Sequence, residues 1–260
     1  MTEYQTLSFE QSGPIARIVL NRPDAANGMN DVMTRELAEV AQHCDDADTK
    51  VVVLTAAGRF FCAGGDLKAM AASPLGAGAF VKGIADDLHR AISTFARMDA
   101  VLITAVNGMA AGAGFSLAIT GDLVLAADSA SFTMAYTKAG LSPDGSSSYY
   151  LPRLIGIRRT QELMLTNRTL KAAEAADWGL VTEVVPADEL EARVQSLADH
   201  IASAARGSSS AVKKLLLASF THNLEDQMAL EARLIAACAD SPDGREGIDA
   251  FLTKRPPNFA

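Results

Sequence analysis

The sequence predicts an α/β fold, and three of its features support this prediction. Apolar runs rich in β-branched residues, which are typical of strands buried on both faces of a sheet, lie at residues 51–55 and 101–106. Segments with apolar residues at helical spacing alternate with these runs. Two glycine-rich turns each connect a predicted strand to a predicted helix. Such alternation is typical of a sheet covered by helices.

The composition narrows the class of protein. The 260 residues are 49% hydrophobic and 21% charged, which suits one large domain or one domain with an appendage. A formal net charge of −8 argues against a nucleic-acid partner, because basic surface supplies most of that affinity. The three widely spaced cysteines (Cys44, Cys62 and Cys238) fit neither a disulfide framework nor a metal site and indicate a reducing compartment. Because there is no secretory signal pattern and no membrane-spanning apolar run, we expect a cytoplasmic protein with no membrane partner.

The first half of the chain supplies the elements of the predicted core. Alternating residues at 4–9 and 15–20 flank the turn-forming segment 10–14 and predict a hairpin. Further strands are expected at residues 51–55, 101–106 and 123–127. Amphipathic helices are expected at residues 31–43, 84–96 and 112–120.

The second half of the chain is predicted to be mainly helical. Helices are expected at residues 158–165, 172–178, 190–205, 211–220 and 224–239. The glycine- and serine-rich segment 206–210 is the clearest boundary signal in the chain. The sequence therefore predicts a core of residues 1–206 followed by a helical segment of residues 207–260.

The helical segment at the end of the chain has more apolar side chains than the core is expected to cover. They are Leu215, Leu216, Leu224, Met228, Leu234 and Ile235. Exposed apolar patches usually mark interfaces, so we expect a homotrimer or a hexamer made of two trimers.

The two glycine-rich turns, at residues 60–67 and 107–114, are candidates for chemistry. Backbone N–H groups without partners gather where a strand leads into a helix, and the helix dipole favours negative charge there. Two such turns can each give one N–H to the same oxygen atom, which is the arrangement of an oxyanion hole. From the turns alone, simple strand-to-helix connections are the alternative. Neither turn matches a dinucleotide-binding fingerprint or a P-loop.

Several motifs along the chain carry a resemblance to a known family. They are FCAGGDL at 61–67, AVNG at 105–108, AGAG at 111–114, LNRP at 20–23, ELMLTNR at 162–168, AEAADWGLV at 173–181 and FLTKRPPNF at 251–259. Together they resemble the crotonase (enoyl-CoA hydratase/isomerase) superfamily over nearly the whole chain. The resemblance implies a crotonase-like spiral of ββα units with a helical C-terminal trimerisation segment. It also implies stabilisation of a thioester enolate, with a coenzyme A thioester as substrate and no permanently bound cofactor.

The resemblance assigns roles to individual residues. By position, the backbone N–H groups of Gly65 and Ala113 are the two oxyanion donors. Residues that fall where the family holds coenzyme A are Ala26, Ala63, Asp66, Leu67 and Lys254. Lys254 belongs to a segment that in the family can reach a coenzyme A phosphate, sometimes on a neighbouring subunit. As a cation at a predicted helix end, it is equally a partner for the helix dipole.

The chain departs from the common enoyl-CoA hydratases at two positions. Those enzymes place water with two glutamates, and this chain has Ser116 and Tyr136 at the corresponding places. Asp144 follows in a Pro-Asp-Gly sequence, which by itself is typical of a turn. Its position resembles the acid/base aspartate of the isomerases of phenylacetyl-CoA breakdown, which shift double bonds or open rings. It also matches the nucleophilic aspartate of 4-chlorobenzoyl-CoA dehalogenase.

His89 and Tyr136 are possible catalytic or pocket residues. His89 matches the histidine that serves as base in the dehalogenase, but a packed or solvated helix histidine is an equal alternative. Tyr136 stands where the dehalogenase has a tryptophan, and it is expected to line the acyl pocket. The favoured interpretation is an enoyl-CoA isomerase or hydratase, in fatty acid or aromatic acid metabolism, with Asp144 as acid/base. The alternatives are an aroyl-CoA dehalogenase, with Asp144 as nucleophile and His89 as base, and a non-catalytic or RNA-binding family member.

Overall fold

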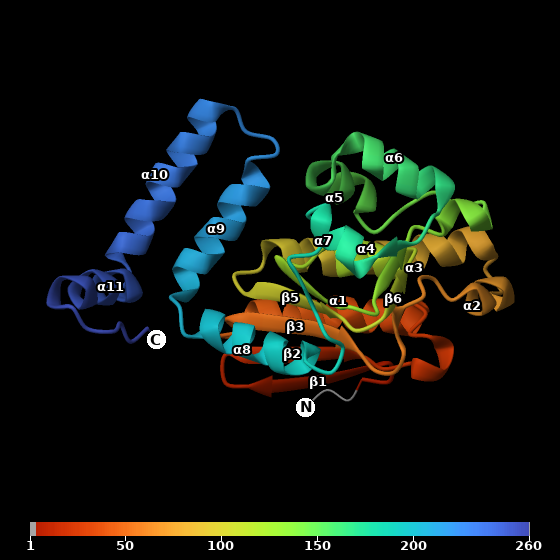
Figure 1. Cartoon of the computed structure of the whole chain (residues 1–260), viewed down its shortest axis with the longest axis horizontal. Helices are drawn as coiled ribbons and strands as arrows, with labels where there is room; N and C mark the ends of the chain where they lie inside the picture. Colours follow the sequence, from red (N-terminus) through yellow and green to blue (C-terminus); the bar gives the residue numbers. More distant parts are fainter. Residues whose placement is uncertain (1–3, 260) are drawn as a thin grey trace.

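The computed structural model describes residues 4–259 and confirms the α/β prediction (Figure 1). A six-stranded sheet has the strand order β1-β2-β3-β5-β7-β10. Only the β1–β2 pair is antiparallel, and the other neighbours run parallel. The strands are β1 (Leu7–Ser12), β2 (Ile15–Leu20), β3 (Val51–Ala56), β5 (Val101–Val106), β7 (Leu123–Ala127) and β10 (Glu183–Val185).

A second, four-stranded sheet has the order β4-β6-β8-β9. Its strands are β4 (Phe60–Cys62), β6 (Met109–Ala111), β8 (Ser131–Thr133) and β9 (Leu170–Lys171). Each of β4, β6 and β8 follows a long strand of the first sheet after a short turn, so the chain repeats a long strand, a short strand and a helical segment. This repeat is the spiral of ββα units that the resemblance implies. The short strands were not predicted, because three residues are too few to show an alternating pattern.

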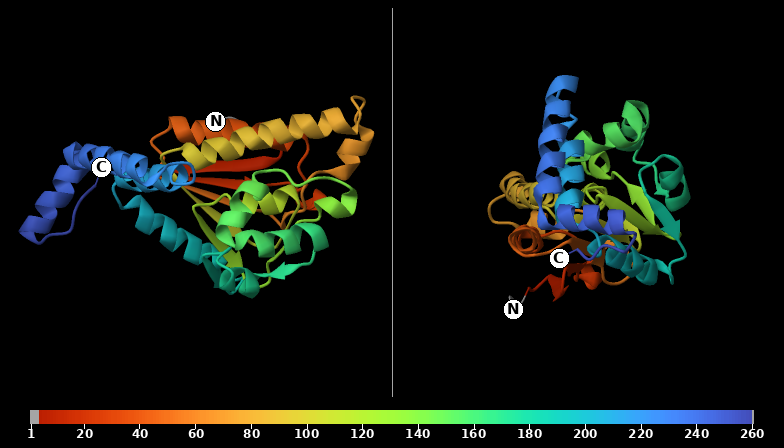
Figure 2. Two further views of the ribbon diagram at one scale, coloured as in Figure 1. Left: turned by 90° about the horizontal axis from the view of Figure 1, so that it is seen from above. Right: turned by 90° about the vertical axis from the view of Figure 1, so that its left-hand side faces the viewer.

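Helices cover both faces of the six-stranded sheet (Figure 2). The helices α1 (Asp31–Asp46) and α3 (Ala77–Arg97) pack against each other on one side, and α8 (Leu190–Ala202) contacts β2, β3, β5 and β7 on the other. Asn30 caps the N-terminus of α1, because its side chain accepts a hydrogen bond from the Met33 N–H. The first four residues of β3 are completely buried, as is expected of a central parallel strand.

The other helices before α8 are shorter than α1 and α3, and two of them, α4 and α7, contact the second sheet. These shorter helices are η1 (Pro23–Ala25), α2 (Leu67–Ala72), α4 (Ala113–Ala118), η2 (Tyr136–Ala139), α5 (Ser147–Leu154), α6 (Gly156–Thr166) and α7 (Ala172–Asp177). Every residue of α4 is buried, whereas α2 has no buried residue. Among residues 4–259, no helix is long and apolar enough to cross a membrane.

The chain ends in a helical tail of α9 (Arg206–Ala218), α10 (Leu224–Asp240) and α11 (Pro242–Thr253), which projects from the core (Figures 1 and 2). Lys213 anchors the first of these helices, because its buried Nζ donates to the carbonyl oxygens of Phe95 and Ala100 and pairs with Asp122. The helix α10 has no buried residue. Large apolar side chains therefore remain exposed on the tail: Val212, Leu216, Leu224, Met228, Ile235, Ile248, Phe251 and Leu252.

Several predicted boundaries are corrected by the structure. Segment 206–210, which the sequence marks as a boundary, forms the beginning of α9. There Ser208 donates to the Ala205 carbonyl oxygen and Ser210 to the Asp99 carboxylate. The strand β1 extends to Ser12, so the hairpin turn is only two residues long. The helices predicted at 84–96 and 190–205 instead begin at Ala77 and end at Ala202, respectively. Residues 1–3 and 260 of the predicted core and tail lie outside the described residues.

Candidate active site

The two glycine-rich turns lie directly against each other. The short strands that lead into them, β4 and β6, are parallel neighbours. Gly64 has a φ of +93° and Gly112 a φ of +51°, which are backbone conformations that favour glycine. A Cβ atom on Gly64 would lie 2.9 Å from the Ala111 carbonyl oxygen and 3.4 Å from the Ala113 nitrogen. Only glycine at position 64 therefore allows the turns to approach this closely.

Each turn leaves one backbone N–H without a partner. The Met29 N–H donates to the Gly64 carbonyl and the Asp66 N–H to the Met29 carbonyl, both at 2.8 Å, so the intervening N–H of Gly65 faces the other way. Ala113 is the first residue of α4, where an N–H has no acceptor within the helix. Within residues 4–259 neither N–H has a hydrogen-bond acceptor. These are the two donors that the resemblance assigned.

Gly65 and Ala113 line the same cavity, which has a volume of about 390 Å³. One wall is apolar and comes from α2, α3 and the loop after η2, through Met70, Val81, Ile84, Ala85 and Leu141. Tyr136 and Asp144 lie in the same lining. Among the described residues that line the cavity, Asp144 is the one carboxylate. The cavity thus combines two free N–H donors, one carboxylate and an apolar surface.

Tyr136 holds one oxygen of the Asp144 carboxylate. Its hydroxyl donates to Asp144 Oδ1 at 2.6 Å and lies 3.0 Å from Ser116 Oγ. Burial and then the neighbouring Asp144 charge raise the pKa of the Tyr136 phenol, which keeps it a proton donor. Asp144 Oδ2 has no hydrogen bond within the described part of the chain, so its lone pairs are available to a substrate.

Ser116 holds the backbone of Asp144 and packs closely against the turn that carries it. Its hydroxyl donates to the Asp144 carbonyl oxygen at 2.8 Å, and its side chain is fully buried. A Cβ atom on Gly145 would lie only 2.6 Å from the Cβ of Ser116. Only glycine at position 145 therefore allows the turn that carries Asp144 to approach Ser116 this closely. Both positions that lack the hydratase glutamates therefore support Asp144 instead.

His89 lies beside Asp144 but outside the 390 Å³ cavity. Its Nε2 accepts a hydrogen bond from the Gly145 N–H at 3.1 Å and lies 3.8 Å from Asp144 Oδ2. The imidazole is about half exposed and lines a separate cleft of about 430 Å³, together with Arg97 and Tyr149. The sequence motifs gave no sign of the bond to Gly145, because the two residues are 56 positions apart.

The residues matched to coenzyme A binding divide into two groups. Ala26 and Ala63 are joined by a hydrogen bond of 3.0 Å between the Ala63 N–H and the Ala26 carbonyl, and Leu67 lines the cavity. Asp66 adjoins them and caps α2. Lys254 lies elsewhere, at the end of α11, on the opposite side of the molecule from α2 (Figure 1). Within one chain, therefore, Lys254 does not join the others.

Asp66 is a structural carboxylate in this arrangement. It accepts from the N–H groups of Lys68 and Ala69, both at 3.1 Å, and pairs with Arg22 at 3.1 Å. Burial opposes its charge, but the hydrogen bond from Ala69 and the pairing with Arg22 outweigh burial and lower the pKa of Asp66.

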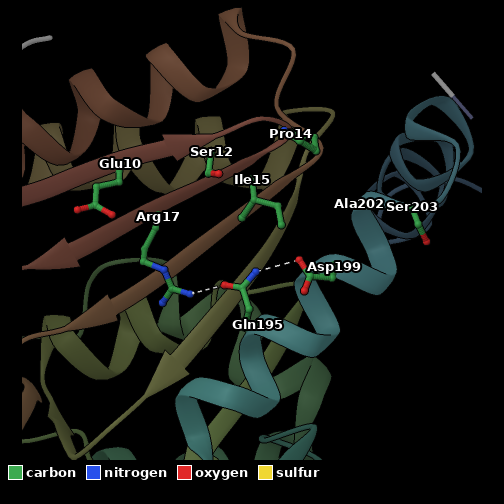
Figure 3. A pocket seen from close by; sticks show the side chains of 9 residues that line it. All are labelled: Glu10, Ser12, Pro14, Ile15, Arg17, Gln195, Asp199, Ala202 and Ser203. Atoms are coloured by element: carbon green, nitrogen blue, oxygen red, sulfur yellow. Dashed lines mark hydrogen bonds between the residues drawn. The ribbon is translucent and has the colours of Figure 1, made fainter.

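Cys62 and a further cleft contribute no group to the lining of this cavity. Burial raises the pKa of the Cys62 thiol to about 12, so Cys62 remains a thiol at neutral pH. A cleft of about 550 Å³ lies between the β1–β2 hairpin and α8 (Figure 3). Three of its polar side chains bond in a row, because Arg17 donates to Gln195 at 3.0 Å and Gln195 donates to Asp199 at 2.9 Å.

Comparisons with known proteins agree on one family. The family model described as enoyl-CoA hydratase/isomerase matches residues 10–260. The chain is 40% identical to a probable enoyl-CoA hydratase of Rhodobacter capsulatus, over 98% of both chains. It is 38% identical to a 1,2-epoxyphenylacetyl-CoA isomerase of Escherichia coli, over 97% of both chains. The crystal structure of an enoyl-CoA hydratase from Polaromonas sp. JS666 is similar with a TM-score of 0.92 and 30% identity, covering 98% of this chain and 99% of that chain.

Proposed function

The chain belongs to the enoyl-CoA hydratase/isomerase family of the crotonase superfamily, and on this premise we propose that it is an acyl-CoA isomerase with Asp144 as acid/base. One observation carries the proposal. Asp144 is the one carboxylate among the described residues lining the cavity into which the free N–H groups of Gly65 and Ala113 open. A single carboxylate suits a reaction in which one group removes a proton and returns it elsewhere.

The proposed reaction begins with the substrate's thioester carbonyl oxygen between the N–H groups of Gly65 and Ala113. Asp144 Oδ2 removes a proton from a carbon made acidic by the thioester. The electrons of the broken C–H bond move toward the carbonyl oxygen, and the two N–H groups stabilise the negative charge that develops there. Asp144 then returns the same proton to a different carbon, which shifts the double bond without gain or loss of atoms.

The surroundings of Asp144 favour isomerisation over hydration. Tyr136 keeps Oδ1 occupied and leaves Oδ2 for the substrate. Addition of water as in the common hydratases uses two glutamates, and Ser116 and Tyr136 stand at their places. The names of the two curated relatives include both activities, and the isomerase name supports the proposal. Opening of a strained ring next to the thioester is an alternative use of the same carboxyl group and the same oxyanion site.

The experiment is a panel of enoyl-, arylacetyl- and epoxyarylacetyl-CoA thioesters, with each product identified by chromatography and mass spectrometry. We expect at least one substrate to give a product of unchanged mass and altered connectivity. Products that are heavier by one water throughout the panel would contradict the proposal in favour of a hydratase.

The dehalogenase alternative is tested separately with 4-chlorobenzoyl-CoA. A dehalogenase would form an ester between the aryl ring and Asp144, which mass spectrometry of the protein detects. The His89 Nε2 is already occupied by the Gly145 N–H, so the structure favours no water-activating role for it. We expect no adduct, and an ester on Asp144 would overturn the isomerase proposal.

We also propose that the tail mediates assembly into a homotrimer or hexamer. The exposed apolar side chains of α9, α10 and α11 support this, since a monomer would leave them in water. In such an assembly Lys254 of one subunit would reach coenzyme A bound to another. Light scattering at micromolar concentration is expected to give a multiple of three chains, and a monomer would contradict the proposal.

A further inference from the structure

His89 is a titratable side chain next to the candidate acid/base that the proposed reaction does not use. We propose that His89 is a positioning residue: its neutral imidazole fixes the peptide group that carries Asp144, and protonation of the imidazole releases it. This inference rests on the proposed function for its effect on rate. Its structural part, the fixing of the peptide group, stands independently of the reaction.

One peptide group is held from both of its ends. The carbonyl of Asp144 and the N–H of Gly145 belong to the same planar unit. Ser116 Oγ and Ser147 Oγ donate to the carbonyl oxygen, at 2.8 and 2.9 Å, and His89 Nε2 accepts from the N–H at 3.1 Å. The three partners belong to three helices: Ser116 to α4, Ser147 to α5 and His89 to α3. The peptide plane is therefore held by three separate elements of the fold.

The turn that contains this peptide group needs such support. Gly145 and Ser146 both have positive φ values, of +60° and +68°. A residue other than glycine in this region is strained and persists only where its surroundings enforce it. A peptide plane held only at its carbonyl end is free to rotate about that end, and the carboxylate of Asp144 would move with it. Small displacements of this kind lower the rate of a positioned proton transfer.

The hydrogen bond also defines the protonation state in which His89 acts. A ring nitrogen that accepts a hydrogen bond has no proton of its own, so the imidazole is neutral and has its proton on Nδ1. An imidazolium has a proton on both nitrogens and cannot accept from Gly145. Its Nε2–H would turn to Asp144 Oδ2, now 3.8 Å away, and would occupy the lone pairs that the substrate proton needs.

Several charged and titratable side chains lie near the imidazole. Asp144 faces Nε2, with its Oδ2 3.8 Å away. Arg97, which is on the same helix, lines the same cleft. Tyr149 and Tyr150 of α5 line the same cleft, and Lys214 of α9 lines the adjoining one. A protonated Nε2 cannot accept from Gly145, so we expect activity to fall on acidification.

Two variants test the proposal through kinetics. His89→Ala removes the acceptor, and we expect kcat at pH 8 to fall about threefold to tenfold, as for one lost hydrogen bond. KM should not change, because His89 does not line the substrate cavity. His89→Gln supplies an acceptor oxygen that does not titrate, so it should restore most of the lost rate and remove the activity loss caused by imidazole protonation. A glutamine variant as slow as the alanine variant, or with the wild-type acid limb, would overturn the proposal.

Amide hydrogen exchange of Gly145 tests the proposal without turnover. In the free full-length protein at constant pH, we expect the Gly145 N–H to be protected in the wild type and in His89→Gln. In His89→Ala it should exchange at least about tenfold faster, as when a protecting bond is lost. Equal exchange in all three proteins would refute the positioning role. The expected exchange pattern in a wild type that isomerises no thioester would refute the proposed function and leave the positioning role in place.

Discussion

The two turns of the candidate oxyanion site share a design and differ in what holds them. Each has a glycine with positive φ immediately before a residue whose N–H is free, Gly64 before Gly65 and Gly112 before Ala113. The second turn leads into α4, whose residues are all buried. The first leads into α2, which has no buried residue and begins with Leu67 at 55% exposure.

The two turns illustrate two ways in which a fold can hold a backbone N–H group in place. Packing in the core immobilises the Ala113 N–H. Gly65 is partly exposed and leads into a helix with no buried residue, so packing is scarce there. Polar contacts replace packing, because Asp66 caps α2 and pairs with Arg22. We therefore expect the second turn to be rigid and the first to be the more easily disturbed.

The largest expected effect comes from removal of the donor in the rigid turn. Ala113→Pro eliminates the N–H at the first position of a helix, where proline is tolerated. We expect kcat to fall at least about a hundredfold, as when one oxyanion donor is lost. Asp31→Pro is the matched control, since it places proline at the first, exposed position of α1, away from the cavity. Normal circular dichroism with undiminished turnover in Ala113→Pro would exclude Ala113 from the site.

A smaller loss of turnover is expected from a substitution at the point where the two turns contact each other. In Gly64→Ala the new Cβ would lie 2.9 Å from the Ala111 carbonyl, so one turn must move away from the other. We expect kcat to fall about tenfold, because the two donors would no longer converge. Gly13→Ala is the control, since Gly13 also has a positive φ but no atom within 4 Å of the added Cβ. If both variants lose stability equally and neither loses turnover, the close contact of the turns has no catalytic importance.

The smallest effect concerns the polar contacts of the exposed turn. The pKa of Asp66 is lowered in the folded chain, so its charge contributes stability at pH values above its ordinary pKa of 3.8. That contribution is lost as the pH falls below 3.8 through the lowered value. We expect the N–H groups of Lys68 and Ala69 to lose exchange protection in this range, while those of α4 keep theirs. Asp66→Asn should remove the pH dependence, and an unchanged dependence in that variant would point to another group.

The sequence predicted the parts of the site that depend on local pattern. Gly65, Ala113 and Asp144 lie in short motifs, and the structure places all three at one cavity. The alternation of strands and helices likewise predicted five of the six strands of the larger sheet, because long buried strands have a clear apolar pattern. The short strand β10 was not predicted. The three-residue strands β4 and β6 have no such pattern, although they set the distance between the turns.

The supporting contacts could not be predicted, since they join residues far apart in the chain. Ser116 and Asp144 are 28 positions apart, and His89 and Gly145 are 56 positions apart. A serine or a histidine within a helix has no local signal that identifies such a partner. The motifs identified Ser116 and Tyr136 only as departures from a glutamate pair. Their contacts with Asp144 depend on how three separate elements pack.

The most direct test of the account is hydrogen exchange on a bound substrate. Wild-type protein is incubated in deuterated water with an arylacetyl-CoA thioester, and mass spectrometry follows deuterium at the carbon next to the carbonyl. We predict exchange by the wild type and by the exposed control Asp46→Asn, with a loss of at least about a hundredfold in Asp144→Asn, in line with removal of a general base. Exchange by Asp144→Asn at the wild-type rate would contradict the central claim that Asp144 moves the proton of a thioester enolate.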